Sequence, residues 1–453
     1  MKVHFIAIGG SAMHNLAIAL HKKGYTVTGS DDEITEPSRG RLAKYGLLPG
    51  KEGWVPERIS GDLDAVILGM HARADNPELL RAGELGLKIF SYPEFLYEQS
   101  KDKTRIVIGG SHGKTTITAM ILHVLKSCGI DCDYMVGAQL EGFEVMVKLS
   151  GKTRFMVLEG DEYLTSPIDR RPKFHLYRPD IALLSGIAWD HINVFPTFEN
   201  YVGQFTSFID LVTPGGTLIW CSEDEELRKI CGKRKEIRSI PYSFPEFRVE
   251  KGITTVFSGE NAYPLMIFGR HNLLNLEGAR LVCEQLGVTA GPFYGAIRSF
   301  RGASRRLELV RRNEHTAVFK DFAHSPSKVR ATIRAVGEQY PGKKLVACLE
   351  LHTFSSLSQG FLPHYEGSMN EADIAIVYYN PHAVALKKLE PVTPEEIRKG
   401  FRRPDLEVFN DSARLRERLS VINWKNKNLL MMSSGNFDGM DLEALAGTVV
   451  ERA

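Results

Sequence analysis

The sequence lacks the features that mark secreted, membrane-spanning and metal-clustered proteins. Its six cysteines form no Cys-x-x-Cys pair and lie far apart, which indicates reduced, mostly buried thiols rather than disulfides or a structural metal. No apolar run approaches the roughly 18 residues that a membrane helix needs. No basic and apolar leader precedes residues 2–6. These absences predict a cytoplasmic protein with no membrane partner.

Net charge is also nearly absent. The chain has 57 lysines and arginines against 55 aspartates and glutamates, a formal net charge of +2. This balance gives no electrostatic reason to expect nucleic acid as a partner. At 453 residues the chain is long enough for about three domains of roughly 150 residues each. The composition is equally consistent with a monomer and with a weak homodimer.

Residues 105–120 are the most informative stretch, because a buried-strand pattern runs into a glycine-rich turn and then a helical pattern. In a phosphate-binding loop, backbone N–H groups surround the phosphates, a lysine reaches their outer oxygens and a threonine hydroxyl binds Mg²⁺. Ile108 stands where a standard loop has its first glycine, so we interpret the turn as a shortened loop. An ordinary turn before a helix is the alternative. The residues expected to bind nucleotide here are Gly110, Ser111, His112, Gly113, Lys114, Thr115 and Thr116.

The N-terminus opens like a Rossmann domain, with an apolar run over residues 3–8, a glycine turn, a helical pattern and a second strand over residues 25–28. The dinucleotide fingerprint requires glycine at positions 7, 9 and 12, but Ala7 and Ala12 stand at two of them. A nicotinamide dehydrogenase is therefore an alternative, and another nucleotide diphosphate is the preferred ligand. The candidate substrate-binding residues are Gly9, Gly10, Ser11, Ala12, Met13 and Asp31.

A third strand pattern, residues 65–68, leads into a polar loop that contains His71. Ligand loops lie at the carboxyl ends of strands in open α/β sheets. We therefore include His71 among the substrate-binding candidates, with a solvated surface side chain as the alternative.

Two further buried-strand patterns follow the phosphate loop. Residues 155–158 end at Glu159, and residues 181–184 lead towards His191. Apolar runs of this kind are typical of parallel strands that are covered on both faces. If the strands are parallel, Thr115, Glu159 and His191 emerge at one edge of the sheet and predict a site for Mg²⁺ and a triphosphate. Taken singly, each side chain could equally be a solvated one.

A meander, with strands expected at residues 253–257 and 264–268, leads to a third candidate cluster. His271 and Asn272 are expected just before a helix and Asn275 one turn into it. These side chains could bind a base or a phosphate, and helix capping by asparagine is the alternative.

A basic junction around Arg305 precedes a third α/β pattern. Its first strand, residues 318–321, ends at Asp321 and is followed by His324. A later strand, residues 429–432, leads into the glycine-rich segment 433–439. The sequence therefore predicts three α/β domains over residues 1–103, 104–302 and 303–453, namely Rossmann-like, P-loop ATPase-like with a parallel sheet, and Rossmann-like.

Taken in order along the chain, these motifs resemble the Mur ligase family of cell-wall peptide synthetases, and the resemblance covers essentially the whole chain. The matching motifs are residues 9–13, 110–116, 159–162, 190–191, 271–275, 305–306 and 321–324. The resemblance implies ATP-driven amide formation through an acyl phosphate, with ATP and Mg²⁺ required. It assigns Lys114, Thr115, Glu159 and His191 to phosphate and magnesium.

The resemblance further implies that His271, Asn272, Asn275 and Asp321 contact ATP, that Arg305 lies near the phosphates and that His324 is a base or substrate orienter. Within the family, residues 161–163 and 168–179 are similar to the branch that joins L-alanyl-γ-D-glutamyl-meso-diaminopimelate to UDP-N-acetylmuramate. Residues 351–354 and Ser325 depart from that branch in the acceptor-binding domain. Addition of L-alanine to the same nucleotide sugar is the alternative reaction, and a non-catalytic nucleotide switch is the alternative of another class.

Overall fold

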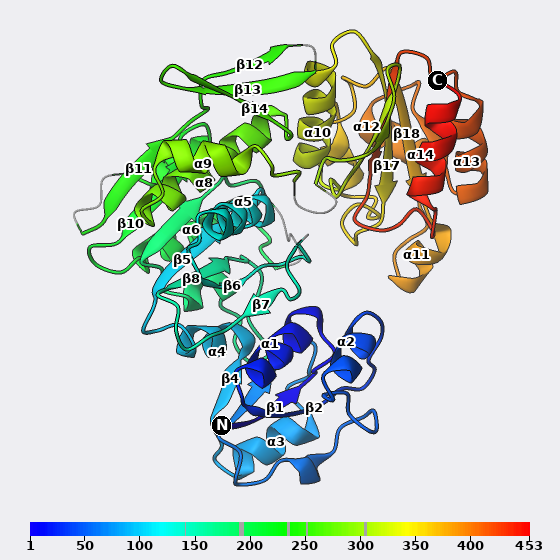
Figure 1. Cartoon of the computed structure of the whole chain (residues 1–453). Coiled ribbons are helices and arrows are strands. Elements are labelled where there is room, and N and C mark those ends of the chain that lie inside the picture. The colour runs from blue at the N-terminus through cyan, green and yellow to red at the C-terminus, as the bar shows by residue number, and fades with distance from the viewer. Residues whose placement is uncertain (141, 190–193, 233–235, 251, 303–305) are drawn as a thin grey trace. The chain divides into compact units, whose positions relative to one another are not determined.

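A computed structural model of the chain describes residues 1–140, 142–189, 194–232, 236–250, 252–302 and 306–453 (Figure 1). The chain forms two compact units. The first unit contains residues 1–243 and 276–293, and the second contains residues 244–275 and 294–453. Helices α8 (Arg270–Gln285) and α9 (Ala290–Ile297) include residues of both units.

The N-terminal part of the first unit is a parallel four-stranded sheet in the order β2-β1-β3-β4. Its strands are β1 (Lys2–Ile6), β2 (Thr26–Ser30), β3 (Ala65–Leu68) and β4 (Ile89–Ser91). Its helices are α1 (Ser11–Lys22), α2 (Ser38–Lys44), the 3₁₀ turn η1 (Pro56–Arg58), α3 (Pro77–Glu84) and α4 (Tyr92–Glu98). All four residues of β3 are buried, as expected for a parallel strand covered on both faces. The predicted Rossmann-like opening is confirmed.

The rest of the first unit is a seven-stranded sheet in the order β11-β10-β9-β5-β8-β6-β7. All neighbouring strands are parallel except β6 and β7. The strands are β5 (Thr104–Gly109), β6 (Asp133–Met135), β7 (Val147–Lys148), β8 (Phe155–Glu159), β9 (Ile181–Leu184), β10 (Thr217–Cys221) and β11 (Arg238–Tyr242). The helices are α5 (Lys114–Ser127), the 3₁₀ turn η2 (Lys173–Leu176), α6 (Phe198–Asp210) and α7 (Glu225–Ile230). Strands β5, β8 and β9 are parallel neighbours, as predicted.

The second unit begins with an antiparallel meander, β12 (Phe247–Glu250), β13 (Ile253–Ser258) and β14 (Asn261–Leu265). The sequence prediction placed the last of these strands too late, at residues 264–268. The register is set by the two-residue turn between Ser258 and Asn261, which are paired. Pro264 is tolerated inside β14 because this strand is an edge strand.

A six-stranded sheet completes the second unit, in the order β15-β16-β20-β17-β18-β19, with only β15 antiparallel to its neighbour. Its strands are β15 (Glu308–Arg312), β16 (Ala317–Asp321), β17 (Lys344–Leu351), β18 (Ile374–Tyr379), β19 (Glu407–Phe409) and β20 (Lys427–Met432). Its helices are α10 (Pro326–Gln339), the 3₁₀ turn η3 (Leu362–Tyr365), α11 (Pro381–Leu386), α12 (Pro394–Phe401), α13 (Ser412–Val421) and α14 (Leu442–Glu451).

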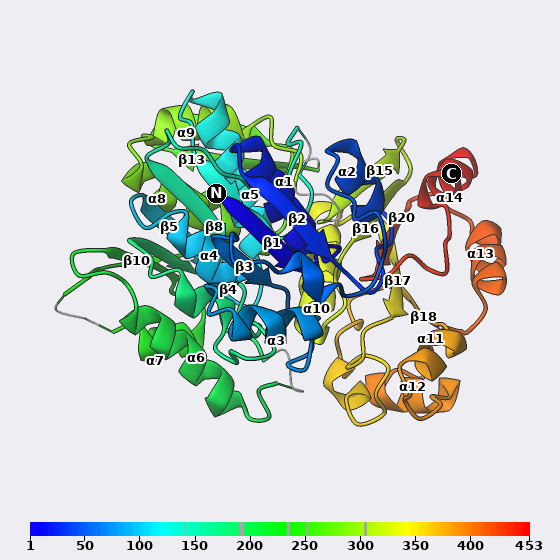
Figure 2. The same ribbon diagram turned by 90° about the horizontal axis from the view of Figure 1, so that it is seen from below.

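The core of this sheet follows the two-residue period of a strand. In β17, Leu345 and Ala347 pack on the face covered by α10 and α12, whereas Val346 and Cys348 pack on the face covered by α13 and α14. Figure 2 shows these helices on the two sides of the sheet. The three α/β sheets agree with the predicted fold class.

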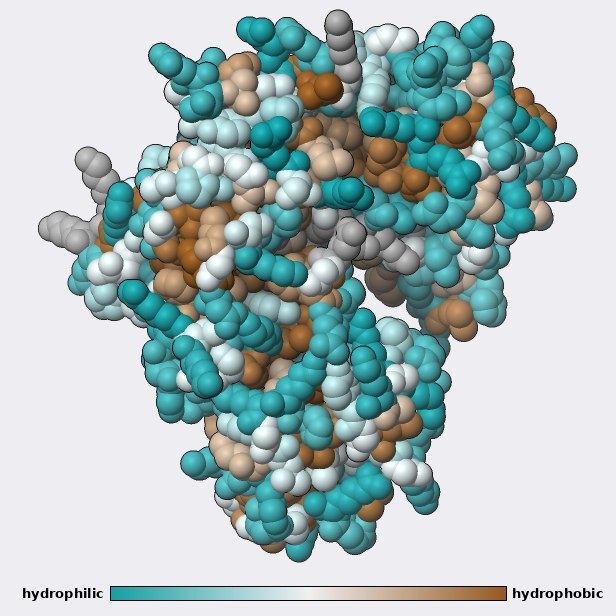
Figure 3. All heavy atoms as spheres, viewed as in Figure 1, coloured by the Kyte–Doolittle hydropathy of each residue, from teal (hydrophilic) through white to brown (hydrophobic). Residues whose placement is uncertain are grey.

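The face of the molecule drawn in Figure 3 is mainly polar. In Figure 3, hydrophilic residues cover most of the visible face and apolar residues form separate patches. In the part of the chain that the structure describes, no helix is long and apolar enough to cross a membrane.

Candidate active site

The phosphate loop connects β5 to α5, and its backbone requires glycine at two positions. Gly110 has a φ of +126° and Gly113, which caps α5, has a φ of +81°. A Cβ atom at position 110 would lie 2.1 Å from Ser185 Oγ, so a larger residue would collide with the loop after β9. The N–H groups of the first turn of α5 are available to an anion, because a helix N-terminus leaves them without intrahelical partners.

Lys114, the first residue of α5, folds back over the loop. Its Nζ donates to Gly110 O at 2.7 Å and to Glu162 Oε2 at 2.5 Å. Burial alone would lower the pKa of Lys114, but the carboxylates of Glu162 and Asp161 outweigh burial and the net shift is upward. The lysine therefore stays charged, as phosphate binding requires.

The side chains of Thr115, in the first turn of α5, and Glu159, at the end of β8, are in contact. Thr115 Oγ1 donates to Glu159 Oε1 at 2.8 Å, and Gly137 N donates to Glu159 Oε2 at 2.8 Å. Burial raises the pKa of Glu159, although the hydrogen bond from Gly137 and the charge of Lys114 oppose this shift. The contact agrees with the predicted parallel pairing of β5 and β8.

These two oxygens fit a magnesium ion. Hydroxyl and carboxylate oxygens are the hard donors that Mg²⁺ prefers, and it usually takes its other ligands from water and substrate phosphates. No group of three or more His, Cys, Asp or Glu side chains is arranged to hold a metal among the residues described. The other predicted ligand, His191, lies outside the described residues, as does Arg305.

Two residues that the sequence analysis did not assign also belong to this site. Glu162 is 1% exposed, and its Oε1 accepts a hydrogen bond from Tyr201 Oη at 3.1 Å. Tyr201 Oη in turn lies 2.8 Å from Ser111 Oγ, which accepts a hydrogen bond from Ala188 N at 2.9 Å. Glu162 was visible in the sequence as part of the motif at residues 159–162. No motif indicated a role for Tyr201, because it lies in a helical segment to which no chemistry was assigned.

The N-terminal turn is organised by Asp31. Gly9 N donates to Asp31 Oδ2 at 2.7 Å, which joins the loop after β1 to the end of the neighbouring strand β2. Burial and the neighbouring Asp32 raise the pKa of Asp31 to about 6. Ser11 is exposed, as are Ala12 and His71, whereas Gly10 is half-buried and Met13 is buried.

The second unit holds the remaining candidates. The sequence analysis placed His271 and Asn272 before a helix, but α8 already begins at Arg270, so they lie in its first turn with Asn275 one turn further. Asn272 Nδ2 donates to Phe268 O at 2.9 Å. Burial lowers the pKa of His271 to about 4, so this imidazole is neutral at physiological pH.

Asp321 ends β16 and holds the turn that follows. Its carboxylate accepts hydrogen bonds from Leu307 N at 2.5 Å and Ala323 N at 2.6 Å. Burial raises the pKa of Asp321, against the opposing charge of Arg306. His324 Nδ1 lies 2.8 Å from Phe322 O.

A cavity of about 300 Å³ lies at the carboxyl ends of β16 and β20. Its lining includes Lys320, Asp321, Ser433, Asn436, Asp441 and Glu443. The sequence analysis assigned no role to the glycine-rich segment after β20. The structure shows that this segment forms a wall of the cavity.

Comparison with known proteins agrees with this arrangement. The model of the Mur ligase family catalytic domain matches residues 2–104, and that of the Mur ligase middle domain matches residues 108–283. A UDP-N-acetylmuramate–L-alanine ligase of Arthrobacter sp. (strain FB24) is 32% identical over an alignment of 387 residues, which covers 83% of this chain and 80% of that protein. The enzyme of the same name from Ligilactobacillus salivarius (strain UCC118) is 32% identical over 78% of this chain and 77% of its own length.

Solved structures share the fold over the whole chain. A UDP-N-acetylmuramate–alanine ligase from Thermotoga maritima superposes with a TM-score of 0.70 at 20% identity, covering 100% of this chain and 99% of its own. A murein peptide ligase from Psychrobacter arcticus 273-4 superposes with a TM-score of 0.65 at 23% identity, covering 99% of both chains. From the phosphate loop, the matched domains and the identity to these relatives, the chain belongs to the Mur ligase family.

Proposed function

We propose that this ATP-dependent amide-bond ligase of peptidoglycan synthesis activates the lactyl carboxylate of UDP-N-acetylmuramate and joins it to the amine of a peptide. The observation that carries the proposal is the meeting of Lys114, Thr115 and Glu159 at one edge of the seven-stranded sheet. A lysine and a threonine at the start of a helix behind a glycine-rich turn, with a carboxylate at the next strand end, suit phosphoryl transfer.

Three segments of the chain would each bind one of the three substrates. Residues 1–103 would bind the nucleotide sugar at the turn held by Gly9 and Asp31, residues 104–302 would bind ATP, and residues 303–453 would bind the acceptor. The turn after β1 supports the first role, because its backbone N–H groups and the start of α1 suit a diphosphate. His271, Asn272 and Asn275 would contact ATP, and so would Asp321.

In the first step, a carboxylate oxygen attacks the γ-phosphorus of ATP and the bond to the β-phosphate oxygen breaks. The products are an acyl phosphate and ADP. The Lys114 ammonium and the N–H groups of the loop would stabilise the charge on the transferring phosphoryl group. Thr115 and Glu159, with His191, would hold Mg²⁺, which when bound shares the negative charge of the phosphates.

In the second step, the acceptor amine attacks the acyl carbon, a tetrahedral intermediate forms and phosphate leaves. The amine must lose a proton during this step, and we assign His324 as the base or substrate orienter. Its Nδ1 faces the carbonyl oxygen of Phe322, so in the neutral imidazole Nδ1 carries the hydrogen and Nε2 carries the lone pair.

We assign the tripeptide L-alanyl-γ-D-glutamyl-meso-diaminopimelate as the acceptor. The residues that carry this resemblance form a hairpin directly after Glu159, in which Lys173 N donates to Tyr163 O at 2.9 Å and Lys173 Nζ pairs with Asp161 at 2.6 Å. The hairpin is thus held by hydrogen bonds and an ion pair beside the proposed ATP site. The cavity next to Asp321 supports an acceptor that carries both amine and carboxylate groups, because its lining contains side chains of both charges.

L-Alanine is the alternative acceptor, because the curated relatives described above are named for it. The test is ligation with UDP-N-acetylmuramate, ATP and Mg²⁺, with the tripeptide and L-alanine offered in separate reactions and product detected by mass. Preference for the tripeptide supports the assignment, and preference for L-alanine overturns it. Binding of ATP and nucleotide sugar without any product would instead identify a nucleotide switch.

A further inference from the structure

A ring of hydrogen bonds begins and ends on the phosphate loop. Lys114 Nζ donates to Glu162, Tyr201 Oη donates to the other oxygen of the same carboxylate, and Ser111 lies 2.8 Å from Tyr201 Oη. A tyrosine has one hydroxyl hydrogen, which Tyr201 gives to Glu162, so Ser111 must be the donor to Tyr201. Ser111 and Tyr201 are 90 positions apart, and the ring therefore ties α6 to the loop.

The aromatic ring of Tyr201 is fixed independently of its hydroxyl. Its side chain is fully buried and its ring lies 5.2 Å from that of Phe205 and 5.5 Å from that of Phe195. The position of the hydroxyl is thus set by packing, and the hydroxyl in turn fixes one oxygen of Glu162.

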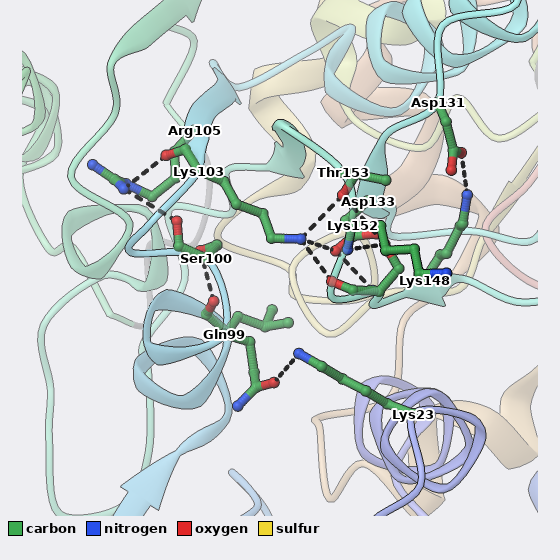
Figure 4. A network of polar contacts seen from close by, with 12 residues as sticks. Lys23, Gln99, Ser100, Lys103, Arg105, Asp131, Asp133, Lys148, Lys152 and Thr153 are labelled. Carbon is green, nitrogen blue, oxygen red and sulfur yellow. Dashed lines mark hydrogen bonds and ion pairs between the residues drawn. The ribbon is translucent and has the colours of Figure 1, made fainter.

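The same sheet contains a second buried lysine pair that provides a contrast (Figure 4). Lys103 Nζ donates to Asp133 at 2.6 Å, to Ser150 O at 2.7 Å and to Thr153 Oγ1 at 3.0 Å. An ammonium group has three N–H bonds, and all three are used. The Lys103 side chain is 5% exposed, and its ammonium has no N–H bond left for a ligand.

Lys114 differs from Lys103 in the way that a ligand-binding lysine should. Its recorded partners in the described part of the chain are two oxygens, of Gly110 and Glu162, which leaves one N–H bond for a further acceptor. Its side chain is 15% exposed, compared with 1% for that of Glu162. The carboxylate is enclosed, whereas the lysine side chain is partly exposed.

From this contrast we propose that Glu162 is a positioning residue, which holds the Lys114 ammonium over the loop in the geometry that receives a phosphate oxygen. Tyr201 in turn fixes Glu162. The inference rests on the proposed ATP-dependent ligation, for which it adds two residues to the phosphoryl-transfer site. Glu162 acts through Lys114 and does not contact the nucleotide itself.

The charge of Glu162 predicts a separation of turnover from binding. A carboxylate near the loop repels the ATP phosphates, so its removal should not weaken ground-state binding of ATP. The same removal releases the lysine from its position, and small errors in the placement of a catalytic group lower turnover strongly. A residue that only stabilised the fold would not separate these two quantities.

The experiment compares Glu162→Gln with Asp133→Asn, each of which neutralises the carboxylate partner of a buried lysine in the first unit. For Glu162→Gln we expect kcat to fall about tenfold or more, with the KM for ATP equal to or below that of the wild type. For Asp133→Asn we expect a lower melting temperature with kcat and the KM for ATP unchanged. A kcat of Glu162→Gln within twofold of the wild type, a raised KM for ATP, or an equal loss of kcat in both variants overturns the proposal.

Tyr201→Phe provides a second test that keeps the buried ring and its packing. We expect kcat to fall about tenfold or more, the effect of losing one hydrogen bond to a charged group. The matched control is Tyr134→Phe, which removes a buried hydroxyl that donates to Val145 O in the same sheet at 3.2 Å. If Glu162→Gln does not fold, Tyr201→Phe decides alone, and wild-type kcat in Tyr201→Phe overturns the proposal.

Calorimetric titration with MgATP separates this inference from the proposed function. If the wild type forms no amide product with any acceptor, the proposed function fails. The inference is then read from binding, where Glu162→Gln should bind MgATP at least as tightly as the wild type and Lys114→Ala more weakly. Weaker binding by Glu162→Gln overturns the inference, whatever the outcome of the ligation assay.

Discussion

The hydroxyl of Thr115 donates a hydrogen bond to the carboxylate of Glu159 at 2.8 Å, from the first turn of α5 to the last residue of β8. The contact exists because β5 and β8 are parallel neighbours, with Ile108 opposite Glu159 in the register. The two oxygens that we propose as ligands of one cation are therefore in contact in this structure.

Replacing this carboxylate should raise the magnesium requirement. We expect Glu159→Gln to raise the Mg²⁺ concentration for half-maximal ligation at least about tenfold, because one ligand oxygen loses its charge. The measurement is ligation rate against Mg²⁺ at saturating ATP. The control is Glu226→Gln, which neutralises a half-buried carboxylate paired with Lys229 on α7, away from the phosphate loop in the sequence. An unchanged magnesium curve in Glu159→Gln would remove this residue from the metal site.

Loss of the loop lysine should affect activity and stability separately. We expect Lys114→Ala to lower ligation at least about 100-fold and to leave a folded protein. Because the variant leaves the buried carboxylate of Glu162 without the positive charge of Lys114, it should also be less stable by about 3–5 kcal/mol.

The double variant Lys114→Ala with Glu162→Gln distinguishes the two effects. It also removes the negative charge of Glu162. We therefore expect the melting temperature to rise most of the way back to that of the wild type, while ligation stays absent. Near-normal turnover in Lys114→Ala would exclude the loop as the ATP site.

Two glycines with positive φ offer a matched pair. Gly110 has a φ of +126° and no room for a Cβ atom, whereas Gly129, just after α5, has a φ of +71° and no neighbour within 4 Å of such an atom. Gly129→Ala should therefore cost only the backbone strain of about 1–3 kcal/mol and keep ATP binding. Gly110→Ala should also displace the loop and abolish detectable binding of MgATP. Equal ATP affinity in both variants would contradict a phosphate loop at residue 110.

Asp31 predicts a pH dependence of stability. Its pKa is raised from the ordinary 3.8 to about 6 in the folded protein. Between pH 4 and 6 the folded state therefore holds a proton that the unfolded state has lost, and the free energy of unfolding rises as the pH falls. A shift of about two pKa units corresponds to about 3 kcal/mol.

The variant Asp31→Asn isolates this effect. It should melt at a higher temperature than the wild type at pH 7 to 8, because it has no charge to bury, and the difference should become much smaller towards pH 4.5. The measurement is the melting temperature of both proteins from pH 4.5 to 8. A difference that does not change with pH would show that the Asp31 carboxyl does not titrate in this range.

Part of this structure could be predicted from the residue patterns of short segments. Apolar runs of strand length identified β5, β8 and β9, and parallel strands place their carboxyl ends at one edge, so the meeting of Thr115 with Glu159 could be predicted. The helix containing His271 began earlier than expected, and β14 ended earlier, because hairpin register and helix starts depend on neighbours outside the local pattern.

The sequence by itself determined the three α/β scaffolds, the glycine loop and the family, since strand periodicity, glycine at positive φ and motif order are properties of short segments. Only the tertiary structure decided which side chains complete the site. Glu162 faces Lys114, and Tyr201 reaches Ser111 from 90 positions away, because the loop after β8 and helix α6 fold onto the phosphate loop. Such contacts depend on how separate elements pack, and no local pattern of residues encodes that packing.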